Sequence, residues 1–219
     1  MRILVCDDHA IFRAGLRAVL GELSAEAELL EAPDVAQALA LVKSHIDTEL
    51  VLLDLHMPGT DGRTGLRQLR AAQPTLPVVI VSATDDPAEM RRVLDEGASG
   101  FISKSSSSAE LLAALRLVLA GGVYVPRAAL AAPAPAAGSG AARREQRRER
   151  AGTLSARQIE VLSLMARGLT NREICGVLDI REGTVKTHIA AIFETLEVSN
   201  RTEAAVAARE LGIKAPGEE

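Results

Sequence analysis

An α/β domain followed by a small all-α domain is the architecture that the sequence predicts. The first 125 residues alternate short apolar runs with helical periodicity five times, and residues 153–213 show helical periodicity alone. Residues 126–152 lie between them and are rich in Ala, Pro, Gly, Ser and Arg. Such a composition buries too little apolar surface to fold, so we expect a disordered linker there. A length of 219 residues suits one medium domain and one small domain.

The predicted strands of the first domain are Ile3–Cys6, Leu29–Leu30, Leu50–Leu53, Pro77–Val81 and Gly100–Ile102. Each is followed by an amphipathic stretch, which is typical of repeated βα units. Five such units predict a doubly wound parallel sheet with right-handed crossovers. The carboxyl ends of the strands in such a sheet meet at one crevice. The polar residues expected there are Asp7, Asp8, Asp54, Ser82 and Lys104.

The composition restricts the core and the cellular compartment. Apolar residues make up 47% of the chain and aromatic residues 2%, so the core must consist of Leu, Val, Ile and Ala. We expect Cys6 and Cys175 to be core residues, because their spacing fits neither a disulfide framework nor a metal site. No segment approaches about 18 uninterrupted apolar residues, and Asp7 comes too early for a signal peptide. The sequence therefore predicts a cytoplasmic protein with no membrane partner.

The C-terminal segment, residues 153–213, predicts four helices. Residues suited to cap the first two helices are Thr153 or Ser155, and Thr170 or Asn171. The third helix should run from about Glu182 to Leu196, and the fourth from Thr202 to Leu211, just before Gly212. The apolar stripe expected on the third helix consists of Val185, Ile189, Ile192, Phe193 and Leu196.

Net charge is distributed unevenly along the chain. Lys and Arg minus Asp and Glu gives −6 for residues 1–125 (11 against 17), +4 for residues 126–152 (6 against 2) and −2 for residues 153–219 (8 against 10). A basic domain is the usual electrostatic sign of nucleic-acid binding, so these charges alone argue against DNA binding. The basic run Arg143–Arg150 is either a solvated part of the linker or a source of extra phosphate contacts.

Three carboxylates are expected at the crevice, and they repel one another unless a cation lies among them. Asp7, Asp8 and Asp54 therefore predict a Mg²⁺ site. The ion can screen a phosphoryl group that approaches Asp54, while Lys104 and Ser82 hold its oxygens from the other side. Each residue alone has a structural alternative, such as a helix cap or a surface lysine. Their joint position at the strand ends favours an aspartyl phosphate at Asp54.

Residues 1–125 resemble the receiver domain of response regulators through Val5–His9, Leu53–Gly62, Val81–Ala83 and Phe101–Lys104. The resemblance implies a flavodoxin-like fold with strand order 2-1-3-4-5, a sensor histidine kinase as partner and Mg²⁺ as cofactor. It implies that Asp54 is the phosphoacceptor and that Lys104 binds the phosphate. The implied Mg²⁺ ligands are Asp7, Asp8, Asp54 and the backbone carbonyl of His56. The implied switch residues are Ser82 with Ala83 beside it, and Phe101, for which a purely structural place in the core is the alternative.

Residues 168–196 have the spacing of a helix-turn-helix, although periodicity alone fits a helical bundle for protein contacts equally well. The resemblance to the LuxR-type helix-turn-helix lies in Leu154–Leu162, Gly168–Ile174, Thr184–His188 and Asn200–Ala204. Together with Asp8–Leu16, it points to the NarL/FixJ subfamily. The implied DNA-binding residues are Thr170, Asn171, Thr184, Lys186, Thr187 and His188. Two residues depart from the family pattern: Ala190 replaces a polar contact residue, and Glu197 replaces the glycine that commonly ends the recognition helix.

The sequence as a whole predicts a transcription factor that is controlled by phosphorylation and is not an enzyme. We expect a homodimer on inverted half-sites of double-stranded DNA, because one copy with net charge −2 neutralises few phosphates. One alternative is a phosphatase of the haloacid-dehalogenase type, but those enzymes have an Asp-x-Asp motif after the first strand, whereas Asp54 follows the third. The other alternative is a regulator that acts through protein contacts or without phosphorylation.

Overall fold

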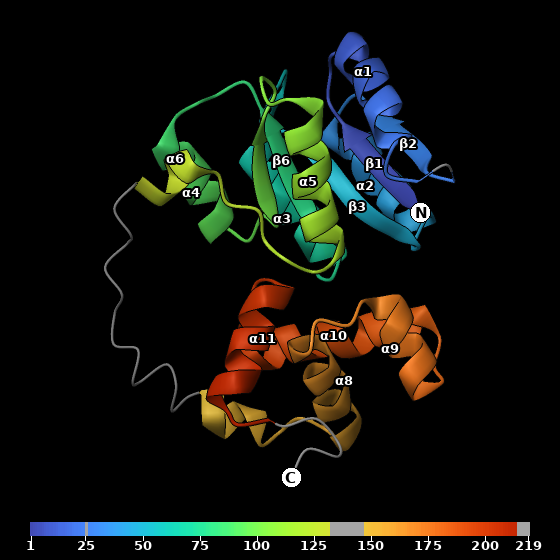
Figure 1. Ribbon diagram of the computed structural model, residues 1–219, viewed down its shortest axis with the longest axis vertical. Helices are drawn as coiled ribbons and strands as arrows, with labels where there is room; N and C mark the ends of the chain where they lie inside the picture. The colour runs from blue at the N-terminus through green and yellow to red at the C-terminus, as the bar shows by residue number, and fades with distance from the viewer. Residues whose placement is uncertain (25, 132–146, 214–219) are drawn as a thin grey trace. The chain divides into compact units, whose positions relative to one another are not determined.

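A computed structural model describes residues 1–24, 26–131 and 147–213 (Figure 1). The chain divides into two compact units, Met1–Ala132 and Pro133–Glu219. Each unit has a hydrophobic core of its own, which is why each can be an independent domain. Among the described residues, no helix combines the length and the apolar character needed to span a membrane.

The first unit contains a five-stranded parallel sheet. Its strands are β1 (Arg2–Cys6), β2 (Glu28–Ala32), β3 (Thr48–Asp54), β6 (Val78–Ser82) and β7 (Gly100–Ser103). They lie in the order β2-β1-β3-β6-β7. These are the five predicted strands in the predicted order 2-1-3-4-5, so both the fold class and the topology are confirmed.

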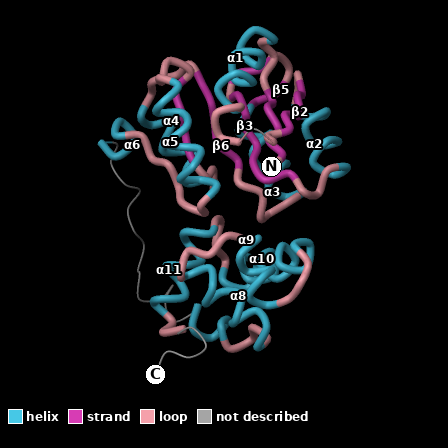
Figure 2. The backbone as a smooth tube through the Cα atoms, turned by 45° about the vertical axis from the view of Figure 1, so that its right-hand side comes forward, coloured by secondary structure: helices cyan, strands magenta, loops and turns pink. Residues whose placement is uncertain are grey.

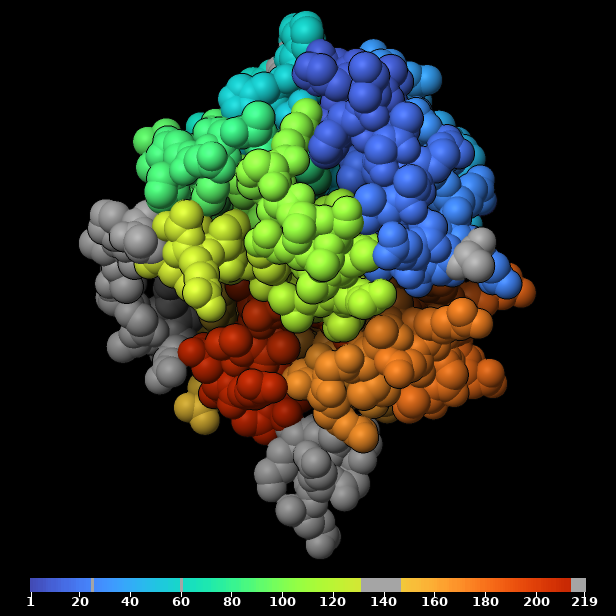
Figure 3. Space-filling model, turned by 45° about the horizontal axis from the view of Figure 1, so that its top comes forward, coloured from blue at the N-terminus to red at the C-terminus, as the bar shows by residue number. Residues whose placement is uncertain are grey.

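Helices cover both faces of this sheet. They are α1 (Ala10–Leu20), α2 (Val35–Ser44), α3 (Gly62–Ala72), α4 (Pro87–Asp95) and α5 (Ser108–Leu119). Alternate residues of a strand point to opposite faces, so Ile3 and Val5 pack in the core beside α1 and α5, whereas Leu4 and Cys6 pack in the core beside α2, α3 and α4. Figure 3 shows the surfaces of α1 and α5 side by side.

Two short features of this unit were not predicted. The first is an antiparallel hairpin of β4 (His56–Met57) and β5 (Thr60–Asp61), directly after the end of β3. The second is helix α6 (Arg127–Ala131), which packs on α4 and buries Ala129. The prediction of a linker that begins at residue 126 was therefore wrong at this end, because residues 127–131 pack on the first unit.

The second unit is helical, as Figure 2 shows. Its helices include α8 (Ala156–Ala166), α9 (Asn171–Leu178), α10 (Glu182–Leu196) and α11 (Arg201–Glu210). These are the four predicted helices, and the apolar stripe predicted for the third is fully buried in α10. Ser155 caps α8 and Thr170 caps α9, each through a reciprocal capping box. Cys6 is buried in the first unit, and half-buried Cys175 packs against the core of the second, as predicted.

The C-terminal end of the predicted linker also belongs to a folded unit. Residues 147–151 are helical, and Ala151 packs against the core of the second unit. Arg147 lies 3.7 Å from a carboxylate oxygen of Glu210, and Arg150 pairs with Glu197. A solvated linker was therefore the wrong prediction for these two arginines. The remainder of the predicted linker, residues 132–146, lies outside the described residues.

Candidate functional site

The carboxyl ends of β1, β3 and β7 bring a lysine between two buried carboxylates. Asp7 follows β1 and Asp54 ends β3, and both are 2% exposed. Lys104 follows β7, and its Nζ lies 2.7 Å from Asp7 Oδ2 and 2.8 Å from Asp54 Oδ2. Burial lowers the pKa of the Lys104 ammonium, but hydrogen bonds to Asp54 and Asp7 outweigh burial and leave the pKa above its usual value. The lysine therefore stays charged between two acids that would otherwise repel each other.

The same acids form a cluster with donor atoms suited to a hard cation. Ligand atoms of Asp7, Asp8, His9 and Asp54 all lie within 4.8 Å of one another. Asp7 Oδ2 faces the Lys104 ammonium at 2.7 Å and Asp8 Oδ1 faces the His9 ring nitrogen at 2.9 Å, and each oxygen keeps a further lone pair that a metal ion could take. Carboxylate oxygens are the ligands that Mg²⁺ prefers. The residues present therefore fit the ion that the sequence predicts, and they add His9, which was not among the predicted ligands.

Ser82, at the end of β6, lies beside this cluster and is fully buried. Its Oγ is 3.2 Å from Nδ1 of His56, and it accepts a hydrogen bond of 3.3 Å from the backbone N–H of Thr84. The other ring nitrogen of His56 lies 3.9 Å from Glu89 on α4. The backbone N–H of His56 donates to Asp54 Oδ1 at 3.1 Å. His56 thus touches both Asp54 and Ser82, whereas the predicted role of its carbonyl stays a prediction.

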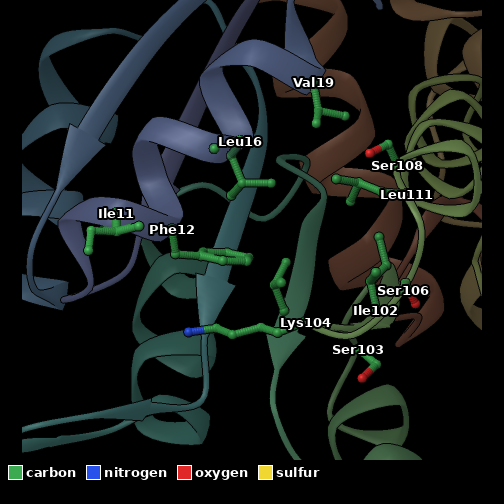
Figure 4. A pocket seen from close by; sticks show the side chains of 12 residues that line it. Ile11, Phe12, Leu16, Val19, Ile102, Ser103, Lys104, Ser106, Ser108 and Leu111 are labelled. Carbon is green, nitrogen blue, oxygen red and sulfur yellow. The ribbon is translucent and has the colours of Figure 1, made fainter.

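The two phenylalanines near Lys104 have different environments. Phe101 is fully buried in the core beside α4. Phe12 lies on the other face of the sheet, with its ring centroid 4.6 Å from Lys104 Nζ, a cation–π contact (Figure 4). Phe12 and the Lys104 stem also line an apolar pocket of about 330 Å³ between α1 and the start of α5. Phe12 therefore contacts the same ammonium group that Asp7 and Asp54 bind.

The predicted DNA-contacting residues divide into exposed and engaged side chains. Thr184 and Thr187 are exposed on α10. Lys186 and His188 are partly buried. The Lys186 side chain is 15% exposed, and its Nζ lies 3.3 Å from Oε1 of Glu182, one turn earlier. Thr170 uses its hydroxyl in the capping box of α9. The structure thus places the six residues along α9 and α10, but it does not leave Lys186 fully exposed.

A partly buried arginine joins the start of α9 to α11. Arg201 donates hydrogen bonds to the Leu169 carbonyl and, at 3.2 Å, to Oδ1 of Asn171. Burial lowers the pKa of this guanidinium to about 10. Asn171 is therefore held by an intramolecular partner at the position where a phosphate contact was predicted. Arg201 lies in the LuxR-type motif Asn200–Ala204, but the sequence of that motif does not reveal the partners of the Arg201 side chain.

Glu197 ends α10 in a left-handed conformation. Its φ and ψ are 51° and 49°, in the region where glycine is usual. The backbone N–H of Glu197 donates to the Glu194 carbonyl, and that of Val198 donates to the Phe193 carbonyl at 3.0 Å. This is a Schellman motif with a non-glycine residue at its left-handed position. The departure noted in the sequence thus coincides with a strained backbone conformation.

Two family descriptions match the chain. Residues 3–116 match the response regulator receiver domain, and residues 152–208 match the luxR family of bacterial regulatory proteins. The glycerol metabolism activator of Pseudomonas putida is 38% identical over an alignment of 221 residues, which covers 98% of this chain and 97% of that protein. The chain is a LuxR-type response regulator.

Further relatives agree with this family. The probable transcriptional regulatory protein NarL of Mycobacterium tuberculosis is 35% identical over 204 residues, covering 93% of this response regulator and 91% of that protein. A crystal structure of a LuxR-family two-component response regulator from Aurantimonas sp. SI85-9A1 is 30% identical, with a TM-score of 0.55, over 59% of this chain and 91% of that one. A LuxR-type response regulator combines a receiver with a DNA-binding domain, which accounts for both units. The phosphatase alternative is dismissed because it leaves the second unit unexplained.

Proposed function

We propose that a sensor histidine kinase phosphorylates this response regulator on Asp54 and that the phosphorylation controls its binding to promoter DNA. One observation supports this most strongly: the buried Asp54 carboxylate lies 2.8 Å from the Lys104 ammonium, which also contacts Asp7 at 2.7 Å. A cation held at this point can bind the oxygens of a phosphoryl group when it arrives on Asp54. The receiver family and the LuxR-type helices supply the kinase and the DNA as partner classes.

The transfer moves one phosphoryl group between two side chains. A carboxylate oxygen of Asp54 attacks the phosphorus of a phosphohistidine, an oxygen–phosphorus bond forms, and the phosphorus–nitrogen bond breaks with its electron pair on the histidine nitrogen. Asp7, Asp8 and Asp54, with the His56 carbonyl, would hold Mg²⁺. When bound, Mg²⁺ supplies positive charge that offsets the charge of the phosphoryl oxygens.

The switch acts through the groups around the new phosphate. Ser82 exchanges its contact with the His56 ring for a phosphoryl oxygen, and the small, exposed Ala83 beside it leaves room for the group. Phe101, already buried, is the aromatic partner of this switch. We propose that phosphorylation promotes dimerisation or releases the C-terminal unit from the receiver. Light scattering with and without beryllofluoride tests this, because an unchanged mass and radius despite confirmed binding would reject it.

DNA recognition uses α10 in the major groove. Thr184, Lys186, Thr187 and His188 would contact base edges or phosphates, and Thr170 and Asn171 would approach the phosphate backbone. Because residues 153–219 carry a net charge of −2, we propose that two copies bind inverted half-sites, so that the second binding event becomes local. Arg150 adds to this by neutralising Glu197 at the end of the same helix.

Intact-mass measurement after incubation with acetyl phosphate and Mg²⁺ tests the phosphoacceptor. The wild type should gain one phosphoryl group, and omission of Mg²⁺ should abolish the gain. Asp54→Asn should gain none, whereas Asp85→Asn, which removes an exposed acid after β6, should behave as the wild type. Equal labelling of Asp54→Asn and the wild type would reject Asp54 as the acceptor.

A further inference from the structure

His9 places an imidazole nitrogen among the carboxylates of the acidic cluster. Its Nδ1 lies 2.9 Å from Asp8 Oδ1 and 3.2 Å from Asp7 Oδ1. Asp7, Asp8 and His9 directly follow β1, and Asp54 joins them from the end of β3. The imidazole therefore belongs to the same group of donor atoms as the three acids.

The two oxygens of Asp7 face different partners. Oδ2 lies 2.7 Å from the Lys104 ammonium, whereas Oδ1 lies beside the His9 ring and accepts a hydrogen bond of 2.7 Å from the His9 backbone N–H. Lysine thus occupies one side of the cluster. The other side presents an imidazole nitrogen and carboxylate oxygens, with Asp8 Oδ1 2.9 Å from His9 Nδ1.

The spacing of these donors is that of ligands around a small dication. With metal–ligand bonds of about 2.1 Å, neighbouring donors lie about 3.0 Å apart in an octahedron and about 3.4 Å apart in a tetrahedron. The separations from His9 Nδ1, 2.9 and 3.2 Å, agree with these values. A hydrogen bond alone would also explain one such distance, but here one nitrogen faces two carboxylates.

We infer that His9 is a ligand of this site and that it enables the site to bind a borderline transition-metal dication, such as Co²⁺, Ni²⁺ or Zn²⁺, in addition to Mg²⁺. Imidazole is a good ligand for these ions, whereas Mg²⁺ prefers oxygen. The inference rests on the proposed metal site of the three carboxylates. Because one set of carboxylates serves both kinds of ion, a bound transition-metal ion excludes Mg²⁺.

The side chain of His9 can be replaced without loss of a helix cap. His9 occupies the N-cap position of α1, but its side chain makes no capping hydrogen bond, and it is 64% exposed. His9→Ala and His9→Asn should therefore leave α1 intact, and asparagine adds a favoured capping residue. His45, at the C-cap of α2 in the same unit, offers a matched control.

Calorimetric titrations of the full chain with Co²⁺ and with Mg²⁺, at one pH, test the inference. His9→Ala and His9→Asn should bind Co²⁺ at least about tenfold more weakly, with Mg²⁺ affinity changed by less than about threefold. His45→Ala should match the wild type for both ions. Proton NMR of the Co²⁺ form supplies a second readout, since a coordinated imidazole gives strongly shifted ring signals that both His9 variants should lack.

Two outcomes separate this inference from the proposed site itself. Co²⁺ binding of unchanged strength in both His9 variants, with shifted imidazole signals absent from the wild type, would overturn the role of His9 and leave the carboxylate site standing. Asp8→Asn should weaken the binding of both ions. A wild-type chain that binds neither ion would overturn the carboxylate site together with the inference.

Discussion

Glycine in place of Glu197 should stabilise the C-terminal unit. Glu197 holds the left-handed position of a Schellman motif, with φ of 51°. A residue with a Cβ pays roughly 1–2 kcal/mol in this conformation, and glycine avoids that cost. Glycine in turn loses about 0.4–1 kcal/mol through the greater freedom of the unfolded chain. The substitution also removes the ion pair with Arg150, in which Glu197 is 65% exposed. Such surface pairs contribute about 0–1 kcal/mol.

Comparison with Glu197→Ala isolates the backbone effect, because both variants lose the ion pair with Arg150. Taking mid-range values, glycine should exceed alanine by about 0.8 kcal/mol in the free energy of unfolding. For a domain of this size, that difference corresponds to about 3–6 °C in melting temperature. Glu197→Gly should also exceed the wild type by about 0.3 kcal/mol, whereas Glu197→Ala should fall about 0.5 kcal/mol below it.

Differential scanning calorimetry of the full chain records the unfolding transitions of the receiver and of the C-terminal unit in one scan. The receiver transition is the one that shifts with Mg²⁺, so the other belongs to the C-terminal unit. Only the second should move in the Glu197 variants. A glycine variant no more stable than the alanine variant would refute the reasoning, since it would mean that the left-handed backbone at residue 197 carries no strain.

Three further predictions concern the lysine, the buried thiol and the recognition helix. Lys104→Met leaves two buried carboxylates facing each other, so the receiver should lose about 3 kcal/mol of stability without a divalent ion, and calorimetry should show a larger stabilisation by Mg²⁺ than in the wild type. Burial raises the pKa of the Cys6 thiol from 9.0 to about 12, so the folded state keeps a proton that the unfolded chain loses above pH 9. The stability that this thiol contributes is present below pH 9 and is lost as pH rises toward 12. Between pH 9 and 10.5, the free energy of unfolding in urea should fall by about 1.6 kcal/mol more in the wild type than in Cys6→Ala, and parallel pH curves would contradict this. Lys186→Ala should weaken binding to a confirmed operator by about 1–3 kcal/mol if the lysine reads a base, and should flatten the salt slope by about one if it touches only phosphate. Glu182→Gln, which removes a carboxylate 3.3 Å from Lys186, should tighten binding in the same titration, and equal affinities for all three proteins would show that another face of α10 meets the DNA.

Periodicity and the strand-end residues predicted most of the fold. Apolar runs followed by amphipathic stretches located all five strands, whereas their order was predicted from the resemblance to receiver domains. The convergence of Asp7, Asp54 and Lys104 followed from topology alone. In the second unit, the apolar stripe predicted α10 from about Glu182 to Leu196, which are the bounds observed.

Side-chain partners could not be predicted, because they depend on rotamers and on contacts between distant elements. His9 and His56 stand in recognised motifs, yet their contacts with Asp8 and Ser82 appear only in three dimensions. The linker was misjudged at both ends for a similar reason. Composition describes the linker as polar and small, but Ala129 and Ala151 are small residues that pack against a folded unit.

The central claim is that phosphorylation of Asp54 controls DNA binding. The measurement that tests it most directly is fluorescence anisotropy on a genomic fragment recovered with the phosphorylated protein, with and without acetyl phosphate, at fixed salt and Mg²⁺. The wild type should change its affinity on phosphorylation, whereas Asp54→Asn should show one affinity under both conditions. The same change in both proteins would mean that control of DNA binding does not pass through this aspartate.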